Sequence, residues 1–387
     1  MSEFNPQLFI WARQAAGLTI EEAATALHIQ PRSLVEIEAG GVDPSRPQLL
    51  RMAQAYRRSL LTFYLPAPPT KGDRGQDFRT VVTERAQSAE VAIDALVRDV
   101  RARQAVVRST LEEDDDFEPP LFIGSLDMGA GVPALKEAIT RVIGFDIAEF
   151  RRQPTNEAAF NLLRAKAESA GVFVMLIGNL GSHHSAIPVA AFRGIVLADP
   201  IAPLVVINDQ DARAAWSFTL LHELAHLWLG QSGISDGPSE QRIEQFCNEV
   251  AAEMLVPRAE IASVSLDGLE EDERVDVIQR LARNWKVSRP MIAYRFLKAG
   301  RITERAWRAL DDKFREMFTA ERQREKAASK SKKNAPSYYV VKRHKVGHAM
   351  LSFAARSLSA GTLSPTKAAQ VLGVSPRSVF TLLGPNA

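Results

Sequence analysis

The sequence is poor in cysteine, in net charge and in long apolar runs, and each shortage excludes a class of protein. Its 387 residues include one cysteine, Cys247, which excludes an intramolecular disulfide and a zinc knuckle built on paired cysteines. The 48 lysines and arginines are balanced by 46 aspartates and glutamates, so no overall charge attracts nucleic acid or an anionic membrane. Apolar runs such as Val172–Ile177 and Leu204–Ile207 are far shorter than the ~20 residues of a membrane helix. Because the opening MSEFNPQLFI also lacks a basic stretch followed by an apolar core, we predict a cytoplasmic protein without a signal peptide.

Residues 7–65 have the pattern of a compact helical unit. Thr19 and Glu22 form a capping-box start, and apolar residues follow on one helical face. A break at 28–31 leads into a second short helix over 32–39, which ends at Gly40–Gly41. Two short helices joined by a tight turn predict a helix-turn-helix.

The same pattern returns near the C-terminus, 345 residues later. The identical positions are Leu18/Leu363, Ala23/Ala368, Ala24/Ala369, Leu27/Leu372, Pro31/Pro376, Arg32/Arg377 and Ser33/Ser378. A weaker echo lies at 281–288, with Leu281, Ala282, Trp285, Val287 and Ser288. We interpret the first pair as a repeat of the helix-turn-helix.

The middle of the chain carries helical and strand-like patterns in separate blocks. Helices are predicted over 76–110 and 156–170, with an acidic connector over 112–120. Strand-like runs follow at 172–178, 187–192 and 194–207, the last broken at Asp199–Pro200, and two strongly apolar helices at 211–229 and 240–255. Blocks rather than alternation predict a mostly helical α+β fold.

The first of these apolar helices contains the segment LHELAHLW, residues 221–228. Residues four apart share a helical face, so His222 and His226 can bind one ion. Glu223 lies roughly 100° around the helix axis, which places its carboxylate beside a water molecule activated by that ion. Because the surrounding residues are apolar, these three ionisable groups would each cost several kcal/mol to bury without a ligand or partner. The pattern therefore predicts metal-assisted hydrolysis.

A metal ion bound by two histidines needs a third protein ligand. We favour Glu244 in the next helix, because Asn248 follows one turn later and suits a hydrogen bond to a ligand histidine. Glu249 and Glu253 are competing candidates, and Glu240 also lies nearby.

Other candidate groups near the motif have simpler interpretations. Cys247 lies among Phe, Val and Ala, which favours a small core residue over a metal ligand. His183 and His184 lie in a Gly/Ser loop, where a solvated loop is the default interpretation and polarisation of a substrate carbonyl the alternative.

At these residues the sequence resembles the ImmA/IrrE family of zinc metallopeptidases. The matching segments are DPIAPLVVIND, FTLLHELAHLWLG and IEQFCNEVAAEMLVP, within residues 199–257. The resemblance implies a zincin-like core in which His222, His226 and Glu244 bind Zn²⁺ and Glu223 is the base. The residue that stabilises the oxyanion is not indicated by these motifs.

The N-terminal unit is similar to the Cro/repressor type of helix-turn-helix. Together the two resemblances imply an endopeptidase that cleaves a helix-turn-helix repressor, in stress response, prophage control or phage defence. The alternative is a DNA-binding regulator or toxin–antitoxin component with a sensory or structural metal site. Glu223 favours the peptidase, because a structural site has no use for a base beside an open position.

The patterns and resemblances divide the chain into six parts. We expect a helix-turn-helix domain at 1–68, a helical connector at 69–140, a metallopeptidase domain at 141–265, a helical subdomain at 266–320, a basic linker at 321–345 and a helix-turn-helix-like segment at 346–387. The composition leaves the oligomeric state open.

DNA contacts would come from the start of the second helix in each helix-turn-helix. In the N-terminal copy these residues are Gln30, Arg32 and Ser33, and in the C-terminal copy Arg377 and Ser378. Residues 1–65 carry six arginines, no lysine and six acidic residues, which is a poor balance for neutralising phosphates. The N-terminal copy is therefore as well suited to docking a protein partner as to binding DNA.

Overall fold

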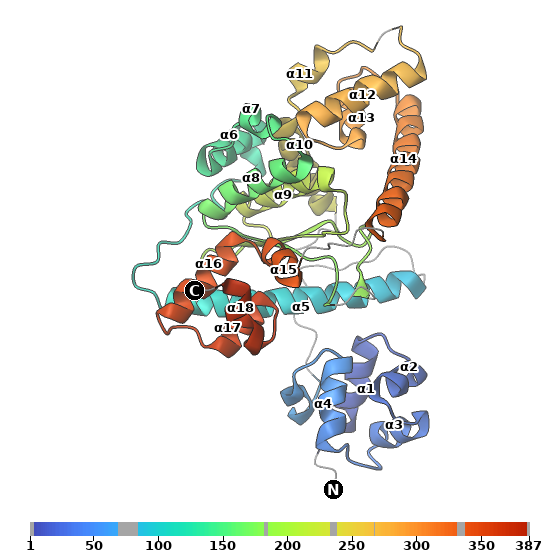
Figure 1. Cartoon of the computed structure of the whole chain (residues 1–387), viewed down its shortest axis with the longest axis vertical. Coiled ribbons are helices and arrows are strands. Elements are labelled where there is room, and N and C mark those ends of the chain that lie inside the picture. The colour runs from blue at the N-terminus through green and yellow to red at the C-terminus, as the bar shows by residue number, and fades with distance from the viewer. Residues whose placement is uncertain are drawn as a thin grey trace. The chain divides into compact units, whose positions relative to one another are not determined.

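The computed structural model describes residues 4–68, 84–181, 185–232, 238–266, 268–330 and 337–384. They form helices and one small sheet, which confirms the mostly helical α+β fold (Figure 1). The chain divides into two compact units, residues 1–99 with 180–187 and residues 100–179 with 188–387. No helix in the described ranges combines the length and apolarity needed to cross a lipid bilayer.

The first unit contains the predicted helix-turn-helix. Its elements are α1 (Pro6–Ala15), α2 (Ile20–Leu27), α3 (Pro31–Glu38), α4 (Arg46–Ala55) and the 3₁₀ turn η1 (Leu60–Tyr64). The capping box forms as expected, with Thr19 Oγ1 accepting from the Glu22 amide at 3.2 Å and the Glu22 carboxylate accepting from the Thr19 amide at 2.9 Å. Apolar side chains from these elements form a core of their own, including Phe9, Leu34, Met52 and Phe63.

The second unit is built on a three-stranded sheet of β1 (Phe173–Leu176), β2 (Gly194–Leu197) and β3 (Leu204–Ile207), in the order β1-β3-β2. Strand β1 is parallel to β3, and β2 is antiparallel to it. The predicted strand at 187–192 was wrong: Pro188 lies in a turn closed by a hydrogen bond to the Ala191 amide. The run at 194–207 forms two strands, because the Asp199 carboxylate accepts from the amides of Ile201 and Ala202, which turns the chain.

The two edges of the sheet differ. Helix α15 (Tyr338–Val346) packs against β1, and Arg164 of α8 (Asn156–Ser169) donates to the Val174 carbonyl there and to the His344 carbonyl of α15. At the other edge, the Asn208 amide donates to the Arg193 carbonyl, so alternate residues of β2 pair with β3. The backbone groups of Gly194 and Val196 therefore face away from β3, toward the outer edge of β2.

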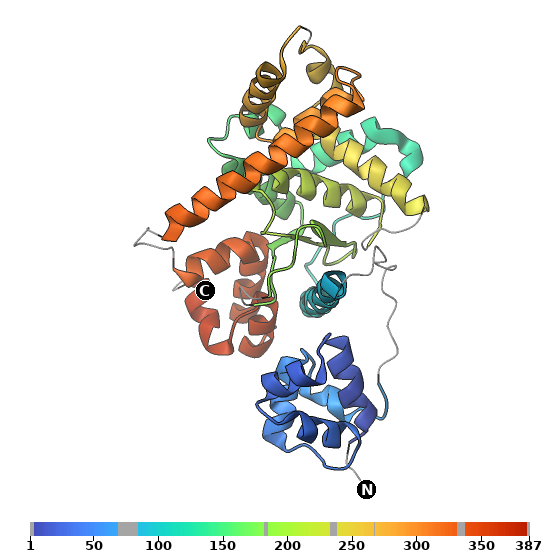
Figure 2. The same ribbon diagram turned by 90° about the vertical axis from the view of Figure 1, so that its right-hand side faces the viewer.

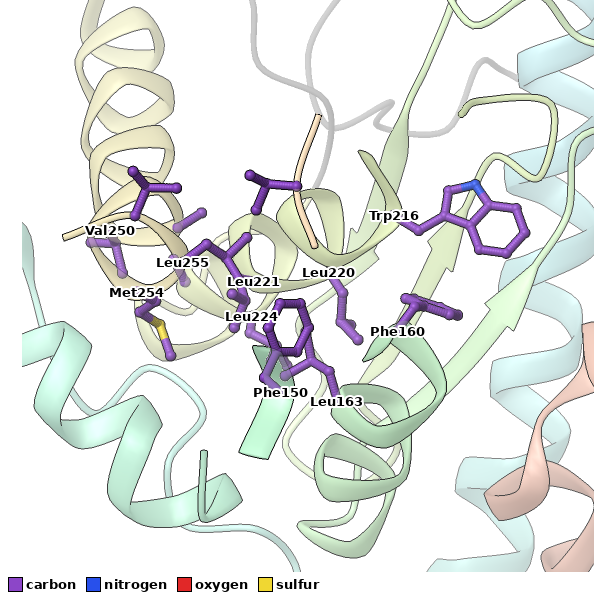
Figure 3. Packing of buried hydrophobic residues seen from close by; sticks show 14 of the residues in the cluster. Phe150, Phe160, Leu163, Trp216, Leu220, Leu221, Leu224, Val250, Met254 and Leu255 are labelled. Carbon is purple, nitrogen blue, oxygen red and sulfur yellow. The ribbon is translucent and has the colours of Figure 1, made fainter. Parts of the chain in front are cut away.

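Helix α9 (Arg213–Trp228) forms the centre of the second unit. It packs against α6 (Gly131–Ile143), α8, α10 (Pro238–Leu255), β2 and β3. Figure 3 shows side chains of α7 (Ile147–Arg151), α8, α9 and α10 meeting in one core: Phe150, Phe160, Leu163, Leu220, Leu221, Leu224, Val250 and Met254. The end of α9 is held by the amides of Gly124 and Leu126, which donate to the Leu227 and Trp228 carbonyls at 2.9 and 3.1 Å. The last carbonyls of a helix lack the usual partner four residues later, and this neighbouring segment supplies hydrogen bonds to two of them.

Three of the expected boundaries lie inside structured elements. The expected connector at 69–140 ends within α6, whose buried Leu135 and Ile139 belong to the same core as α9. The expected basic linker at 321–345 is largely helical, because α14 (Glu304–Lys330) continues through its first part and α15 begins at Tyr338. Its Ala, Arg, Lys and Glu residues are strong helix formers, and this preference outweighs the effect of their charge. Residues 331–336 lie outside the described residues.

A turn of the same geometry forms at each of the three helix-turn-helix patterns in the sequence. The turns lie between α2 and α3, between α12 (Glu271–Trp285) and α13 (Arg289–Lys298), and between α17 (Pro365–Leu372) and the pair η4 (Pro376–Ser378) and α18 (Val379–Leu383). The turn residues His28, Lys286 and Gly373 are all left-handed, with φ of 55°, 59° and 63°. The next amide in each turn donates to the carbonyl five residues earlier, at 3.0, 3.1 and 3.0 Å. The weaker echo at 281–288 therefore has the same turn as the two stronger copies.

Candidate metal centre and active site

Helix α9 presents His222 and His226 one turn apart on the same face. Their Nε2 atoms lie 3.1 Å from each other, with His226 buried and His222 partly buried. The remaining surface of α9 is covered by the core, so both imidazoles are held in fixed positions beneath the sheet edge. Helical spacing and burial together bring two imidazole nitrogen atoms to one point.

Helix α10 brings the carboxylate of Glu244 to the same point. Its Oε2 atom lies 3.1 Å from His222 Nε2, and its Oε1 atom lies 3.1 Å from His226 Nε2. Four ligands at the usual zinc distances of 2.0–2.1 Å would be separated by about 3.4 Å in a tetrahedral arrangement. The spacing of these three donors therefore fits a bound metal ion of that size. Within the described ranges, these residues form the one set of three such donors close enough to bind a metal ion.

Glu223 lies beside these three residues and is buried. The exposed fraction of the residue is 6%, and this burial raises its pKa to about 7. The nearby Glu244 carboxylate adds to the rise, and His226 opposes it. A carboxyl group with a pKa near neutrality can both accept and return a proton.

The backbone of β2 passes directly over the Glu223 carboxylate. A Cβ atom added to Gly194 would lie 2.7 Å from Glu223 Cδ and 2.8 Å from Thr219 Cγ2, and closer still to Glu223 Oε1. Only glycine leaves room for the carboxylate at this point.

These groups share one cavity of about 260 Å³. Its lining comprises Phe192, Arg193, Gly194, Phe218, Thr219, His222, Glu223, His226, Glu244 and Asn248. The β2 edge, α9 and α10 each contribute part of the wall, so a peptide lying along the edge would pass next to the carboxylate and the imidazoles.

Asn248 lines this cavity, and among the described residues no hydrogen bond joins it to either candidate ligand histidine. The Nδ1 atom of His222 is buried and has no hydrogen-bond partner among the described residues. Asn248 is exposed at the cavity surface, one turn after Glu244. Its amide is thus available to a molecule in the cavity.

The two competing carboxylates on α10 are occupied elsewhere. Glu249 and Glu253 accept from the guanidinium of Arg295 in α13, at 2.8 and 2.5 Å. Both lie on faces of α10 other than that of Glu244. The side chain of Glu240, and His183 with His184, lie outside the described residues.

Cys247 is a core residue. It is fully buried in the cluster around α9, and this burial raises the pKa of its thiol. Its sulfur atom is not one of the clustered atoms that could bind a metal ion. The structure therefore agrees with its interpretation as a small apolar side chain.

The candidate DNA-contacting residues lie at the surface of their two copies. Gln30 and Arg32 are exposed at the start of α3, and Arg32 forms a 3.2 Å ion pair with Glu36. Ser33 is partly exposed. In the C-terminal copy, Arg377 is exposed and Ser378 is partly exposed within η4.

Sequence reasoning missed the part of the site contributed by β2. Phe192, Arg193 and Gly194 follow no metal-binding motif, and Thr219 looks like one more residue of an apolar helix. The one available signal was Gly194 itself, since a glycine at the start of a strand often marks a close approach of the backbone to another group.

Comparison with known families identified two regions. Residues 177–297 match the model of the IrrE N-terminal-like domain of the peptidase M78 family, and residues 11–61 match a helix-turn-helix domain. Comparison of the chain with curated proteins and with solved structures gave no match. The first match includes the whole cavity and both helices that carry its donors, and the second includes α2 and α3. The chain therefore contains an IrrE N-terminal-like peptidase domain together with an N-terminal helix-turn-helix domain.

Proposed function

We propose that this chain is a zinc-dependent endopeptidase that cleaves a specific protein. The observation that carries the proposal is the convergence of His222, His226 and Glu244 beside the buried carboxylate of Glu223. Two imidazoles and one carboxylate are a common ligand set for a catalytic zinc ion that keeps a position open. Such an ion, when bound, lowers the pKa of water and polarises the carbonyl group of the scissile bond.

Glu223 is the proton carrier of this proposal. Its carboxylate takes a proton from the water molecule as the new C–O bond forms at the scissile carbonyl carbon. It then returns the proton to the amide nitrogen as the C–N bond breaks, which balances the hydrolysis. Burial suits Glu223 to both steps, because it raises the pKa of the group toward neutrality.

The outer edge of β2 is the proposed binding surface for the substrate. An extended peptide that pairs with the free backbone groups of Gly194 and Val196 passes Glu223 in the cavity wall. Because pairing with a strand edge uses the middle of a peptide, this arrangement favours an endopeptidase. The exposed amide of Asn248 is positioned to hydrogen-bond to the same peptide, in place of its expected role at a histidine.

We infer that the substrate is a helix-turn-helix transcriptional repressor. Support comes from the helix-turn-helix domain at 11–61, which links the peptidase to gene regulation in one chain. Cleavage of a repressor would relieve repression in stress response, prophage control or phage defence. In the alternative, a DNA-binding regulator or toxin–antitoxin component, the metal site would be sensory or structural, and Glu223 would have no catalytic role.

The first prediction concerns Glu223→Gln. The amide cannot accept the proton, so we expect cleavage of a helix-turn-helix repressor substrate to fall by about 10²–10⁴-fold. Zinc content, measured by atomic absorption, should stay at the wild-type value. Glu137→Gln, an exposed position on α6, is the matched control and should cleave normally. Cleavage by Glu223→Gln at the wild-type rate would show that Glu223 is not the base.

The second prediction concerns Glu244→Ala. Loss of one of three ligands should lower the zinc content of the purified chain sharply and abolish cleavage with it. Gln245→Ala, the exposed neighbour on α10, should retain the metal. Unchanged zinc content in Glu244→Ala would assign the third ligand to another residue.

The third prediction concerns Gly194→Ala. The added methyl group would occupy the space of the Glu223 carboxylate, so we expect the rate of cleavage to fall at least tenfold with zinc binding retained. Gly41→Ala is the control, because its Cβ would approach no closer than 3.4 Å to the Glu36 carbonyl oxygen. Wild-type kcat in Gly194→Ala would mean that the close approach does not position the base.

A second proposed function is DNA binding, favoured by the exposure of Gln30 and Arg32 at the start of α3. This is the part of a helix-turn-helix that enters the major groove. We propose that Arg32 contacts DNA in the first copy and Arg377 contacts DNA in the C-terminal copy.

The fourth prediction tests these contacts in the full chain. Arg32→Ala or Arg377→Ala should weaken binding to duplex DNA. If the lost contact is to a phosphate, the slope of log affinity against log salt should also fall by about one. Arg308→Ala on α14 is the control, because Arg308 is exposed outside both copies. Wild-type binding that is independent of salt would contradict phosphate contacts.

A further inference from the structure

The middle helix-turn-helix differs from the other two at one buried position. Nine residues after each left-handed turn residue, the first copy has Ile37, the middle copy has Arg295 and the last copy has Leu382. All three side chains are buried, with exposed fractions of 3%, 1% and 0%. In the outer copies this residue is a buried apolar side chain, and in the middle copy it is a fully buried charge.

The charged guanidinium of Arg295 forms hydrogen bonds to helix α10. Its Nη1 atom donates to Glu249 at 2.8 Å, its Nη2 atom donates to Glu253 at 2.5 Å, and its Nε atom donates to the Val256 carbonyl at 2.9 Å. Val256 follows the last residue of α10, where carbonyl groups have no partner within the helix and a cation is favoured. Figure 1 shows α12 and α13 beside α10 in the second unit. One guanidinium thus holds two successive turns and the end of this helix.

The three hydrogen bonds grip α10 on the side away from the candidate metal ligand. At about 100° per residue, Glu253 lies roughly opposite Glu244 on α10, and Glu249 lies about 140° from it. The face between them is packed by small and flexible apolar side chains, including Cys247, Ala251 and Met254. Such contacts tolerate a small rotation of the helix, whereas three directional hydrogen bonds to one planar group do not.

Stability alone does not account for this arrangement. Replacing buried ionic groups by apolar groups of similar volume is often neutral or stabilising. The outer copies, with Ile37 and Leu382, demonstrate that the helix pair forms with an apolar side chain at this position. The arginine fixes the rotation of α10 and its position along the helix axis. This matters because a metal ligand must be held to within a fraction of an ångström.

We propose that Arg295 is a positioning residue for the metal site, and that the α12–α13 helix pair acts as a brace that sets the rotation of α10 and thereby the location of the Glu244 carboxylate. The second helix of this copy is accordingly turned toward the peptidase core and is not free to enter a DNA groove. Arg289, its other arginine near the turn, is paired with Glu321 of α14 at 2.7 and 3.0 Å. The inference rests on the proposed zinc site at His222, His226 and Glu244.

The fifth prediction tests the brace by zinc affinity in the full chain. Arg295→Leu introduces the residue present at this position in the last copy, and we expect the Kd for zinc to rise about 10- to 100-fold, as for other residues that orient metal ligands. The Kd is measured by competition with a chromophoric chelator. Cleavage at saturating zinc should stay within a few-fold of wild type, because Arg295 does not touch the substrate.

Three further variants separate positioning from simple loss of stability. Arg289→Leu removes the other arginine of α13, which is paired with Glu321 of α14. It should lower the unfolding temperature of the zinc-free chain but leave the Kd for zinc unchanged. Glu249→Gln combined with Glu253→Gln removes the charged acceptors on α10 and should raise the Kd as Arg295→Leu does. Arg295→Lys, which keeps the charge without the fork of donors, should give an intermediate Kd and replaces Arg295→Leu in the test if that variant does not fold.

An unchanged zinc Kd in Arg295→Leu, or in Arg295→Lys and the double glutamine variant, would overturn the brace. An equal rise of the Kd in Arg289→Leu would also overturn it, because the effect would then be general destabilisation. Failure of the proposed function is distinct: the wild-type chain would then bind no zinc or cleave nothing, whatever the variants do.

Discussion

The second unit depends on the burial of three ionisable side chains within one apolar helix. His222, Glu223 and His226 lie on α9, whose other faces pack into the core against α6, α8, α10 and the sheet. Burial of such groups is costly unless each has a partner or ligand. Helix α10 supplies a partner for the imidazoles by bringing the Glu244 carboxylate to both of them, whereas burial of Glu223 beside Gly194 raises its pKa. The sheet edge, the cavity and the raised pKa of Glu223 all follow from this arrangement.

The same local motif serves different purposes at three places in the chain. All three copies share a left-handed turn and the same backbone hydrogen bond, since these depend on short-range geometry. Their second helices differ in what they present: α3 exposes Arg32, α18 follows the exposed Arg377, and α13 turns Arg295 into the core. One buried position distinguishes the copies: it is apolar in the outer two, with Ile37 and Leu382, and is an arginine bonded to α10 in the middle one, with Arg295.

Local patterns predicted the elements around the site well, because their signals are short in range. The capping box at Thr19 and the apolar helices over 211–229 and 240–255 follow from spacing within one or two turns. The predictions failed where one feature of the local sequence outweighed another. Pro188 prevents the strand expected at 187–192, and the helix propensity of 321–330 outweighs its charge. The third metal ligand on α10 was harder to predict from the sequence. Glu244, Glu249 and Glu253 are the same residue type, and they differ only in the neighbouring elements that their side chains face.

By itself, the sequence determined the helix-turn-helix copies, the spacing of His222 and His226, and the position of Glu223 beside them. These are properties of single helices, fixed by 3.6 residues per turn and by capping. Only the tertiary structure decided which carboxylate of α10 meets the histidines, that Asn248 faces the cavity, and that Gly194 lies against Glu223. Each of these depends on the rotation and approach of elements far apart in the chain, which are set by packing in the core rather than by any local pattern.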